Sequence, residues 1–264
     1  MNRRLASLDS WLGVTIFLAV WQALSALGLL DPRIIPSPIA VVAGTASHLT
    51  LAQFLGDVEA SLFRVMAGFL IASVLGVVLG VASGWYPLVG DLLRAPIDLL
   101  RPIPPLAWIP AALIWFGLGE PSKVFVISLG AFFPAFTNTL AGMRKIDRDI
   151  LNAARMMGLS GWRLLYRVAV PAIEPDILTG LRIAWSLSFG VLVAAELIAS
   201  QSGLGNLIVR ARELGQIDLV VFGILAIGIT TLLTDFIIAQ FFFRFRLRWY
   251  VKATTAGLAG TRER

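Results

Sequence analysis

Long apolar runs separated by short polar segments dominate the pattern of this chain. Six runs come close to the length of about 20 residues that an α-helix needs to cross a bilayer. The first run follows Arg3 and Arg4 and exceeds the about 7–15 apolar residues of a signal peptide, so we interpret it as a retained helix. The pattern predicts an all-α polytopic membrane helix bundle, forming a single domain over residues 1–264. The six predicted spans cover residues 11–30, 62–84, 92–116, 122–143, 176–200 and 218–243.

The composition agrees with a membrane protein. Hydrophobic residues make up 58% of the chain and charged residues only 14%, whereas soluble domains have about 45–50% and about 25%. A soluble protein of this size needs more polar surface than these few charged residues can provide. Most of the surface of this chain must therefore face lipid. The net charge of +6 is not gathered on one basic face, which argues against nucleic-acid binding. The chain has no cysteine, which excludes disulfides.

The distribution of lysine and arginine predicts the orientation of the bundle. With a cytoplasmic N-terminus, the cytoplasmic regions would hold 14 of these residues and the outer regions five. Positive charge concentrates in cytoplasmic loops, so this assignment is favoured and both termini are expected in the cytoplasm. The longest cytoplasmic segment is then residues 144–175.

The span over residues 62–84 carries a row of small residues. A small residue at every fourth position forms one groove along a helix and lets another backbone approach closely. We expect the row to pack inside one subunit, and a contact between subunits is the alternative. The row consists of Gly68, Ala72, Gly76, Gly80 and Gly84.

Segment 144–175 predicts a hairpin of two short helices. Asp149 can cap a helix over residues 150–157, which Gly158 ends in the manner of a helix C-terminal glycine. Ser160 can cap a second helix, which stops before Pro171.

The first of these helices has an apolar face that includes Leu151, Ala154 and Met157. This face has little to pack against within one small membrane protein. It therefore predicts a docking surface for a partner.

The same segment carries a motif. Asn152-Ala153-Ala154, followed at fixed spacing by Gly158 and Pro171, resembles the EAA motif of permeases from binding-protein-dependent ABC importers. In that family the motif forms the coupling helix that docks on the ATPase subunit. Asn152 stands where the family has glutamate, so a salt bridge at this position is not expected. The resemblance assigns ATPase coupling to Asn152, Ala153, Ala154, Met157, Gly158, Leu159 and Pro171.

Further motifs place the resemblance in the nitrate, sulfonate and taurine branch, over about residues 20–250. They are the runs 100–110, 115–120, 178–182, 194–196 and 202–205. The resemblance implies a type I importer in the bacterial inner membrane, which carries a small anion such as a sulfonate, taurine or nitrate. The implied partners are a second permease copy in a homodimer, two cytoplasmic ATPase subunits that bind ATP and Mg²⁺, and a periplasmic substrate-binding protein.

The third apolar run is rich in proline. Proline lacks an amide hydrogen, so carbonyl groups in this run lose their helical partners, which lipid tolerates only beside protein or a water-filled cavity. We hypothesise that this run lines the translocation path, and a kink that merely shapes the bundle is the alternative. Charged residues in the spans either serve the path or pair with each other, for example an arginine with Asp98 or Glu196. The predicted path residues are Arg101, Pro102, Pro104, Pro105, Trp108, Arg182 and Glu196.

Other functional classes are less compatible with the sequence. The chain has no Gly-x4-Gly-Lys-Ser/Thr phosphate loop, so we expect it to bind no cofactor and not to be an enzyme. His48 is the only histidine and has no second ligand nearby in sequence, so no metal site is expected. A secondary transporter or channel would not need a docking hairpin, and a membrane enzyme would show catalytic side chains at one membrane face.

Overall fold

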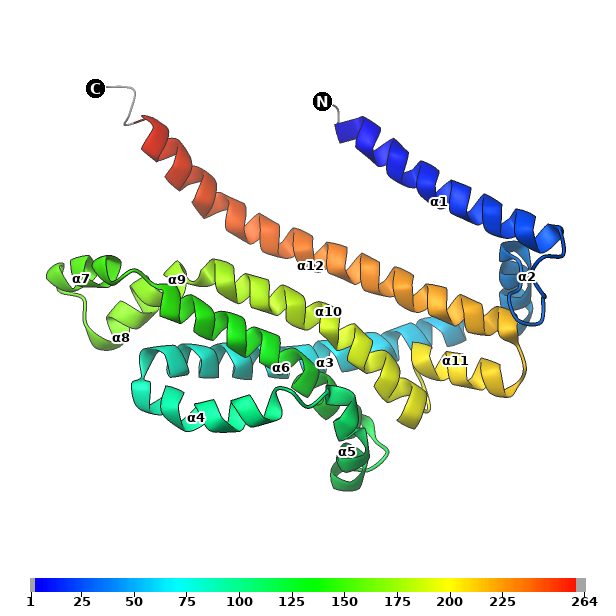
Figure 1. Cartoon of the computed structure of the whole chain (residues 1–264), viewed down its shortest axis with the longest axis horizontal. Helices are drawn as coiled ribbons and strands as arrows, with labels where there is room; N and C mark the ends of the chain where they lie inside the picture. Colours follow the sequence, from blue (N-terminus) through cyan, green and yellow to red (C-terminus); the bar gives the residue numbers. More distant parts are fainter. Residues whose placement is uncertain (1–2, 260–264) are drawn as a thin grey trace. The chain divides into compact units, whose positions relative to one another are not determined.

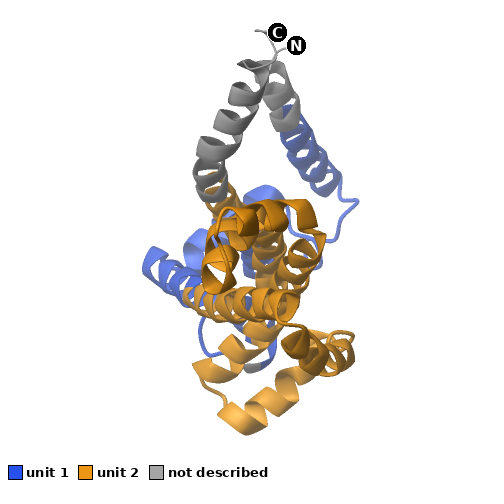
Figure 2. Ribbon diagram, turned by 90° about the vertical axis from the view of Figure 1, so that its left-hand side faces the viewer, with its two compact units in different colours: residues 1–62, 196–229 blue, residues 63–195, 230–264 orange. Residues whose placement is uncertain are grey.

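The computed structural model describes the backbone of residues 3–259 and the side chains of residues 12–198 and 200–240. All regular elements over the described backbone are helical. The chain divides into two compact units (Figure 2), which are residues 1–62 with 196–229 and residues 63–195 with 230–264. Three long helices contain the division points of the chain: α3 (Leu51–Trp85), α10 (Glu174–Ala199) and α12 (Ile217–Ala259).

Other elements complete each unit (Figure 1). The first unit also contains α1 (Arg3–Ala26), α2 (Pro38–His48) and α11 (Leu204–Glu213). The second unit also contains α4 (Pro87–Leu100), η1 (Pro105–Trp108), α5 (Ile109–Phe116), α6 (Glu120–Lys145), α7 (Arg148–Met156), α8 (Gly161–Leu164), η2 (Leu165–Ala169) and α9 (Val170–Ala172).

The helices confirm the prediction of a polytopic membrane helix bundle, although not its number of spans. Within the described residues, α3, α6, α10 and α12 are long and apolar enough to cross a membrane. The bent pair formed by α4 and η1–α5 adds a fifth crossing if it is counted as one span. The described apolar part of α1 is only Leu12–Ala26. The count of six spans and the cytoplasmic position of both termini stay predictions.

The predicted span 92–116 is not one continuous helix. Helix α4 ends at Leu100, and η1–α5 continues from Pro105 at an angle of 87° to it. Pro102, Pro104 and Pro105 cannot donate backbone hydrogen bonds, and each proline ring excludes the carbonyl of the preceding turn. The proline run therefore breaks the helix and redirects the chain, as the change of direction between α4 and α5 shows (Figure 1).

The row of small residues on α3 packs against α6. At Gly68, Gly76, Gly80 and Gly84, the nearest atoms to an added Cβ all belong to α6. Ala72 is buried in the same row. Packing inside one subunit, the interpretation favoured from the sequence, is confirmed. Beside this contact, Phe69 and Trp185 meet edge to face with ring centroids 5.1 Å apart, which joins α3 to α10.

Helix α11 organises the core of the first unit. Residues 201–217 lie between two predicted spans, yet Leu204–Glu213 form a helix. Leu207 and Ala211 on this helix are buried with Leu219, and Leu49, Val220 and Phe222 pack around them. This helix is missed from sequence because it is short and its polar residues break the apolar pattern.

Candidate functional site

The first helix of the hairpin begins and ends at capping residues. The Asp147 side chain accepts a hydrogen bond from the Asp149 N–H at 2.9 Å, so Asp147 is the cap, and the assignment of Asp149 to that role is wrong. Asp149 instead lies in the first turn of α7, where a carboxylate favours the positive end of the helix dipole. Gly158 has φ +85° and follows the last turn, which confirms the predicted C-terminal glycine.

The second helix of the hairpin does not stop before Pro171, as the sequence predicted. After α8, residues Leu165–Ala169 widen into a π-helical turn, and α9 runs through Pro171 to Ala172. A proline inside a helix clashes with the carbonyl four residues earlier. The wider turn before Pro171 gives that carbonyl room, so the chain stays helical.

The apolar face of α7 is divided between the core and the surface. Leu151 packs against a buried cluster that includes Leu165 and Ile173, and Ala154 is buried as well. The prediction that these two side chains are free for a partner is wrong, because Leu151 packs against residues of α6 and of the second hairpin helix, and Ala154 is buried. Met157 remains outside, with 78% of its surface exposed.

Large apolar side chains point outward from the rest of the hairpin. Met156 is 86% exposed, and Ile150 is half exposed. Trp162 and Tyr166 on the second helix are also largely exposed. We call the set Met156, Met157, Trp162 and Tyr166 the hairpin surface residues.

The other predicted coupling residues lie around this surface. Asn152 and Ala153 are exposed on α7, Leu159 is partly buried, and Pro171 is exposed. The Asn152 Oδ1 accepts a hydrogen bond from Arg155 Nη1 at 3.0 Å. This amide thus makes a contact inside the helix at the position where the family has glutamate.

The proline break opens onto a cavity of about 520 Å³ in the second unit. Arg101, Pro104 and Pro105 line one side of this cavity, and residues of α6 and α10 line the other. The cavity wall is mostly apolar, with Thr137 and Asn138 among its few polar residues. The cavity therefore brings together three of the predicted path residues.

The remaining predicted path residues do not line this cavity. Pro102 is exposed in the break, and Trp108 packs near Trp115 with ring centroids 6.3 Å apart. Arg182 faces Asp235 at 3.7 Å. Arg182 therefore faces a carboxylate, as the sequence suggested for an arginine in a span, but the partner is Asp235 of α12 and not Asp98.

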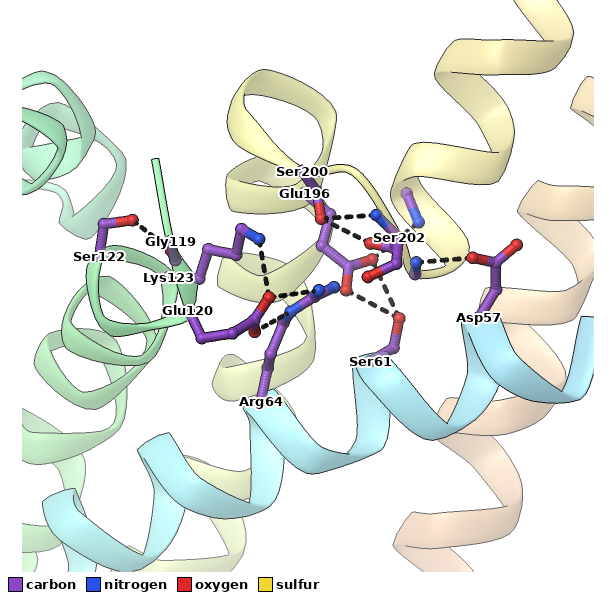
Figure 3. Close-up of polar contacts among 12 residues, drawn as sticks. Asp57, Ser61, Arg64, Gly119, Glu120, Ser122, Lys123, Glu196, Ser200 and Ser202 are labelled. Carbon is purple, nitrogen blue, oxygen red and sulfur yellow. Dashed lines mark hydrogen bonds and ion pairs between the residues drawn. The ribbon is translucent and has the colours of Figure 1, made fainter. Parts of the chain in front are cut away.

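Glu196 belongs to a buried polar cluster in the first unit (Figure 3). Its carboxylate accepts hydrogen bonds from Ser61 Oγ at 2.8 and 3.0 Å and from the Gly205 N–H at 2.8 Å. The Gly203 N–H donates to Asp57 Oδ1, and the Leu204 N–H donates to Ser61 Oγ.

These contacts serve the N-terminus of α11. The first N–H groups of a helix have no acceptor within the helix. Gly203, the residue directly before α11, has no side chain that could accept a hydrogen bond from them. The acceptors come from two other helices, with Asp57 and Ser61 on α3 and Glu196 on α10. Arg210 on α11 also donates a hydrogen bond to Asp57 Oδ2 at 2.6 Å. In this structure, Glu196 holds α11 in place.

A second polar cluster lies in the other unit (Figure 3). Arg64 is 1% exposed and donates to both carboxylate oxygens of Glu120, from Nε at 2.5 Å and from Nη2 at 2.8 Å. Lys123 Nζ donates to the same carboxylate at 3.0 Å. This cluster joins α3 to the first turn of α6. Arg64 and Lys123 are two of the five basic residues that the sequence assigns to the outer regions, and their burial is not visible in the sequence.

The chain matches known proteins over most of its length. A family model described as the binding-protein-dependent transport system inner membrane component matches residues 72–247. The taurine transport system permease protein TauC of Escherichia coli is 37% identical over 230 residues, covering 84% of this chain and 82% of that protein. The nitrate import permease protein NrtB of a Synechocystis strain is 35% identical over 236 residues, covering 86% and 84%.

A third relative, from Escherichia coli, is named for the transport of aliphatic sulfonates. It is 38% identical over 231 residues, covering 88% of each chain. The family match, these identities and the apolar helices of the bundle agree with one another. The chain therefore belongs to the binding-protein-dependent transport system inner membrane components, as a multi-pass ABC transporter permease.

Proposed function

We propose that this chain forms the translocation path of an ATP-driven importer and receives force through the hairpin of residues 144–175. The observation that carries the proposal is the exposure of the hairpin surface residues on a hairpin that is itself well anchored. Met157 and Trp162 expose most of their surface to the outside. Large exposed apolar side chains of this kind mark interaction sites.

The anchoring of the hairpin suits a mechanical role. Leu151 of α7 and Ile177 near the start of α10 pack against one buried cluster, which includes Met143 at the end of α6. The Lys145 Nζ lies 3.6 Å from Asp176 Oδ1, which joins the two ends of the hairpin. A partner that pushes on the hairpin surface residues would therefore move α6 and α10 together.

The moving helices line the cavity beside the proline break. Helices α6 and α10 supply its wall opposite Arg101, Pro104 and Pro105. A displacement of the hairpin would change the width of this cavity, which supports its assignment as part of the path. The two proposed states, open to the inside and open to the outside, would differ in this width.

The relatives support a small oxyanion as the substrate. Their names refer to taurine, nitrate and aliphatic sulfonates, which all carry a planar or tetrahedral group of oxygen atoms bound to nitrogen or sulfur. Arg101 on the cavity wall can offer several N–H donors to such a group. We propose two copies of this permease, two cytoplasmic ATPase subunits that bind ATP and Mg²⁺, and a periplasmic binding protein as the working assembly.

The coupling proposal is tested by co-purification. The full-length tagged chain is extracted from its own host, and the ratio of co-purifying ABC ATPase to permease is measured. Met157→Asp places a charge on the proposed interface and should lower this ratio at least about tenfold, because a buried unpaired charge costs several kcal/mol.

Leu214→Asp is the matched control. Leu214 is 70% exposed, comparable with Met157 at 78%, but lies just after α11 and outside the hairpin. This variant should keep the ATPase ratio of the unchanged protein. Equal retention of the ATPase by Met157→Asp and the unchanged chain would contradict the proposal, and so would equal loss in both variants.

A further inference from the structure

A second cavity of the second unit carries several charged residues, and the translocation path hypothesis uses only one of them, Arg101. It has a volume of about 760 Å³ and lies between α3, α4 and α6. Arg94, Arg101, Arg144 and Lys145 line it, together with one carboxylate, Asp98. Four cations and one anion leave this cavity with a formal charge of +3.

Two of the four cations lack a counter-charge in the part of the chain that the structure describes. Arg94 and Asp98 form a loose pair at 3.9 Å, and Lys145 pairs with Asp176. Neither Arg101 nor Arg144 makes an ion pair or a side-chain hydrogen bond among the described residues. Charged groups beside membrane helices normally face a partner or a water-filled cavity, so an anion would complete this arrangement.

A neutral donor of the same cavity is also without a partner. Ser83 lines the cavity from α3 and is 7% exposed. Its hydroxyl makes no hydrogen bond to any described residue. Buried hydroxyl groups are nearly always hydrogen-bonded, so this one indicates a ligand or ordered water.

The helix dipole does not account for the whole charge. Arg144 and Lys145 lie in the last turn of α6, where cations are favoured in any helix. Arg101, however, lies at the proline break and lines both this cavity and the neighbouring cavity beside Pro104 and Pro105. We call the cavity between α3, α4 and α6 the basic cavity. It adjoins the cavity assigned to the path, and the two cavities share the guanidinium of Arg101.

We propose that the basic cavity is a second binding site for an oxyanion, reached from the path cavity past Arg101. The inference rests on the proposed function, since it takes the oxyanion to be the transported substrate. Guanidinium groups bind the oxygens of sulfonate, sulfate or nitrate through paired N–H donors. The Ser83 hydroxyl would add a neutral donor to the same ligand.

Arginine protection tests this site without any ATPase. The full-length permease is placed in nanodiscs of phosphatidylcholine and treated with phenylglyoxal, which modifies arginine, and the modified residues are identified by mass spectrometry. Nitrate, sulfate and methanesulfonate should each slow the modification of Arg101 and Arg144. Arg33 lies exposed in the first unit, outside the cavity, and its modification should not change. Chloride at equal ionic strength should protect none of the three.

A matched pair of variants measures the contribution of one guanidinium. Arg144→Gln should raise the concentration of sulfate for half-maximal protection of Arg101 by about tenfold, the lower end of the effect of losing a charge-assisted hydrogen bond. Arg33→Gln removes the same charge elsewhere and should leave that concentration unchanged.

Absence of protection at Arg101 and Arg144 would overturn the site, and so would any of three further results. They are equal protection of Arg33 and Arg101, protection by chloride as strong as by sulfate, and protection only when phosphatidylglycerol replaces part of the phosphatidylcholine. The last result would assign the cavity to a lipid headgroup. Loss of protection with intact ATPase co-purification would reject the site alone, whereas failure of co-purification with intact protection would reject the importer proposal.

Discussion

A methyl group at position 76 has no room between α3 and α6. An added Cβ would lie 2.8 Å from Ala135 Cβ, 3.0 Å from the Phe136 N and 3.1 Å from the Phe132 O. Ordinary contacts start at 3.4 Å, so Gly76→Ala requires the helices to separate by about 0.6 Å. Two of the three contacted atoms belong to the backbone, so no side-chain rotation relieves the contact.

The expected cost follows from two opposing terms. Overpacking by one methyl group costs about 1–3 kcal/mol. Alanine returns about 1 kcal/mol relative to glycine through its helix propensity. The close contacts at Gly68, Gly80 and Gly84 hold the same two helices at the same separation, which resists the shift. The overpacking cost should therefore lie in the upper part of its range, at about 2–3 kcal/mol, so we expect the free energy of unfolding to fall by about 1–2 kcal/mol and the melting temperature by about 2–8 °C.

The control is a glycine in another membrane-capable helix. Gly228 on α12 has no atom within 4 Å of an added Cβ. Gly228→Ala should keep or raise the stability, because only the propensity term acts. Thermal unfolding of both purified variants in one detergent, followed by size-exclusion chromatography, gives the two melting temperatures. If the melting temperature of Gly76→Ala equals or exceeds that of Gly228→Ala, the close packing of α3 on α6 is refuted.

Three further substitutions probe other parts of the structure. Gly158→Ala should destabilise the hairpin by about 1–2 kcal/mol, because the φ of +85° at this position is unfavourable for alanine. Gly158→Asn should cost less, because asparagine adopts this backbone region more readily. Hydrogen exchange in α7 should therefore be faster in the alanine variant than in the asparagine variant. Ser61→Ala removes a donor to Glu196 and an acceptor for α11, at a cost of about 1–3 kcal/mol, and unchanged proteolysis of residues 200–216 would count against that capping role. Arg64→Lys cannot reproduce the two-donor contact with Glu120 and should lower the melting temperature by several degrees, whereas an unchanged value would show that charge alone suffices there.

The hairpin shows how far the sequence could be followed. Local signals gave its two helices and the glycine bend, because capping and left-handed backbone are decided within a few residues. The burial of Leu151 and Ala154 could not be predicted, since it depends on α6 and the second hairpin helix coming together. The continuation through Pro171 was missed because the π-helical turn that permits it is not visible in the sequence.

The polar clusters show the opposite case. Asp57, Ser61 and Glu196 are separated by up to 139 residues, and no local pattern relates them. Only the folded chain places them at the start of α11, where free N–H groups need acceptors. The sequence suggested that Glu196 could lie on the path, whereas its structural role is set by these partners.

The membrane class, the row of small residues and the helix-disrupting character of the proline run follow from the amino-acid sequence alone, because hydrophobicity, side-chain size and missing amide hydrogens act on nearby residues whatever the fold. The family resemblance came from motifs of the same local kind. Tertiary structure decided which charges are paired, which apolar side chains stay exposed and where cavities form. These properties depend on distances between helices that are far apart in the chain, and long-range packing alone sets those distances.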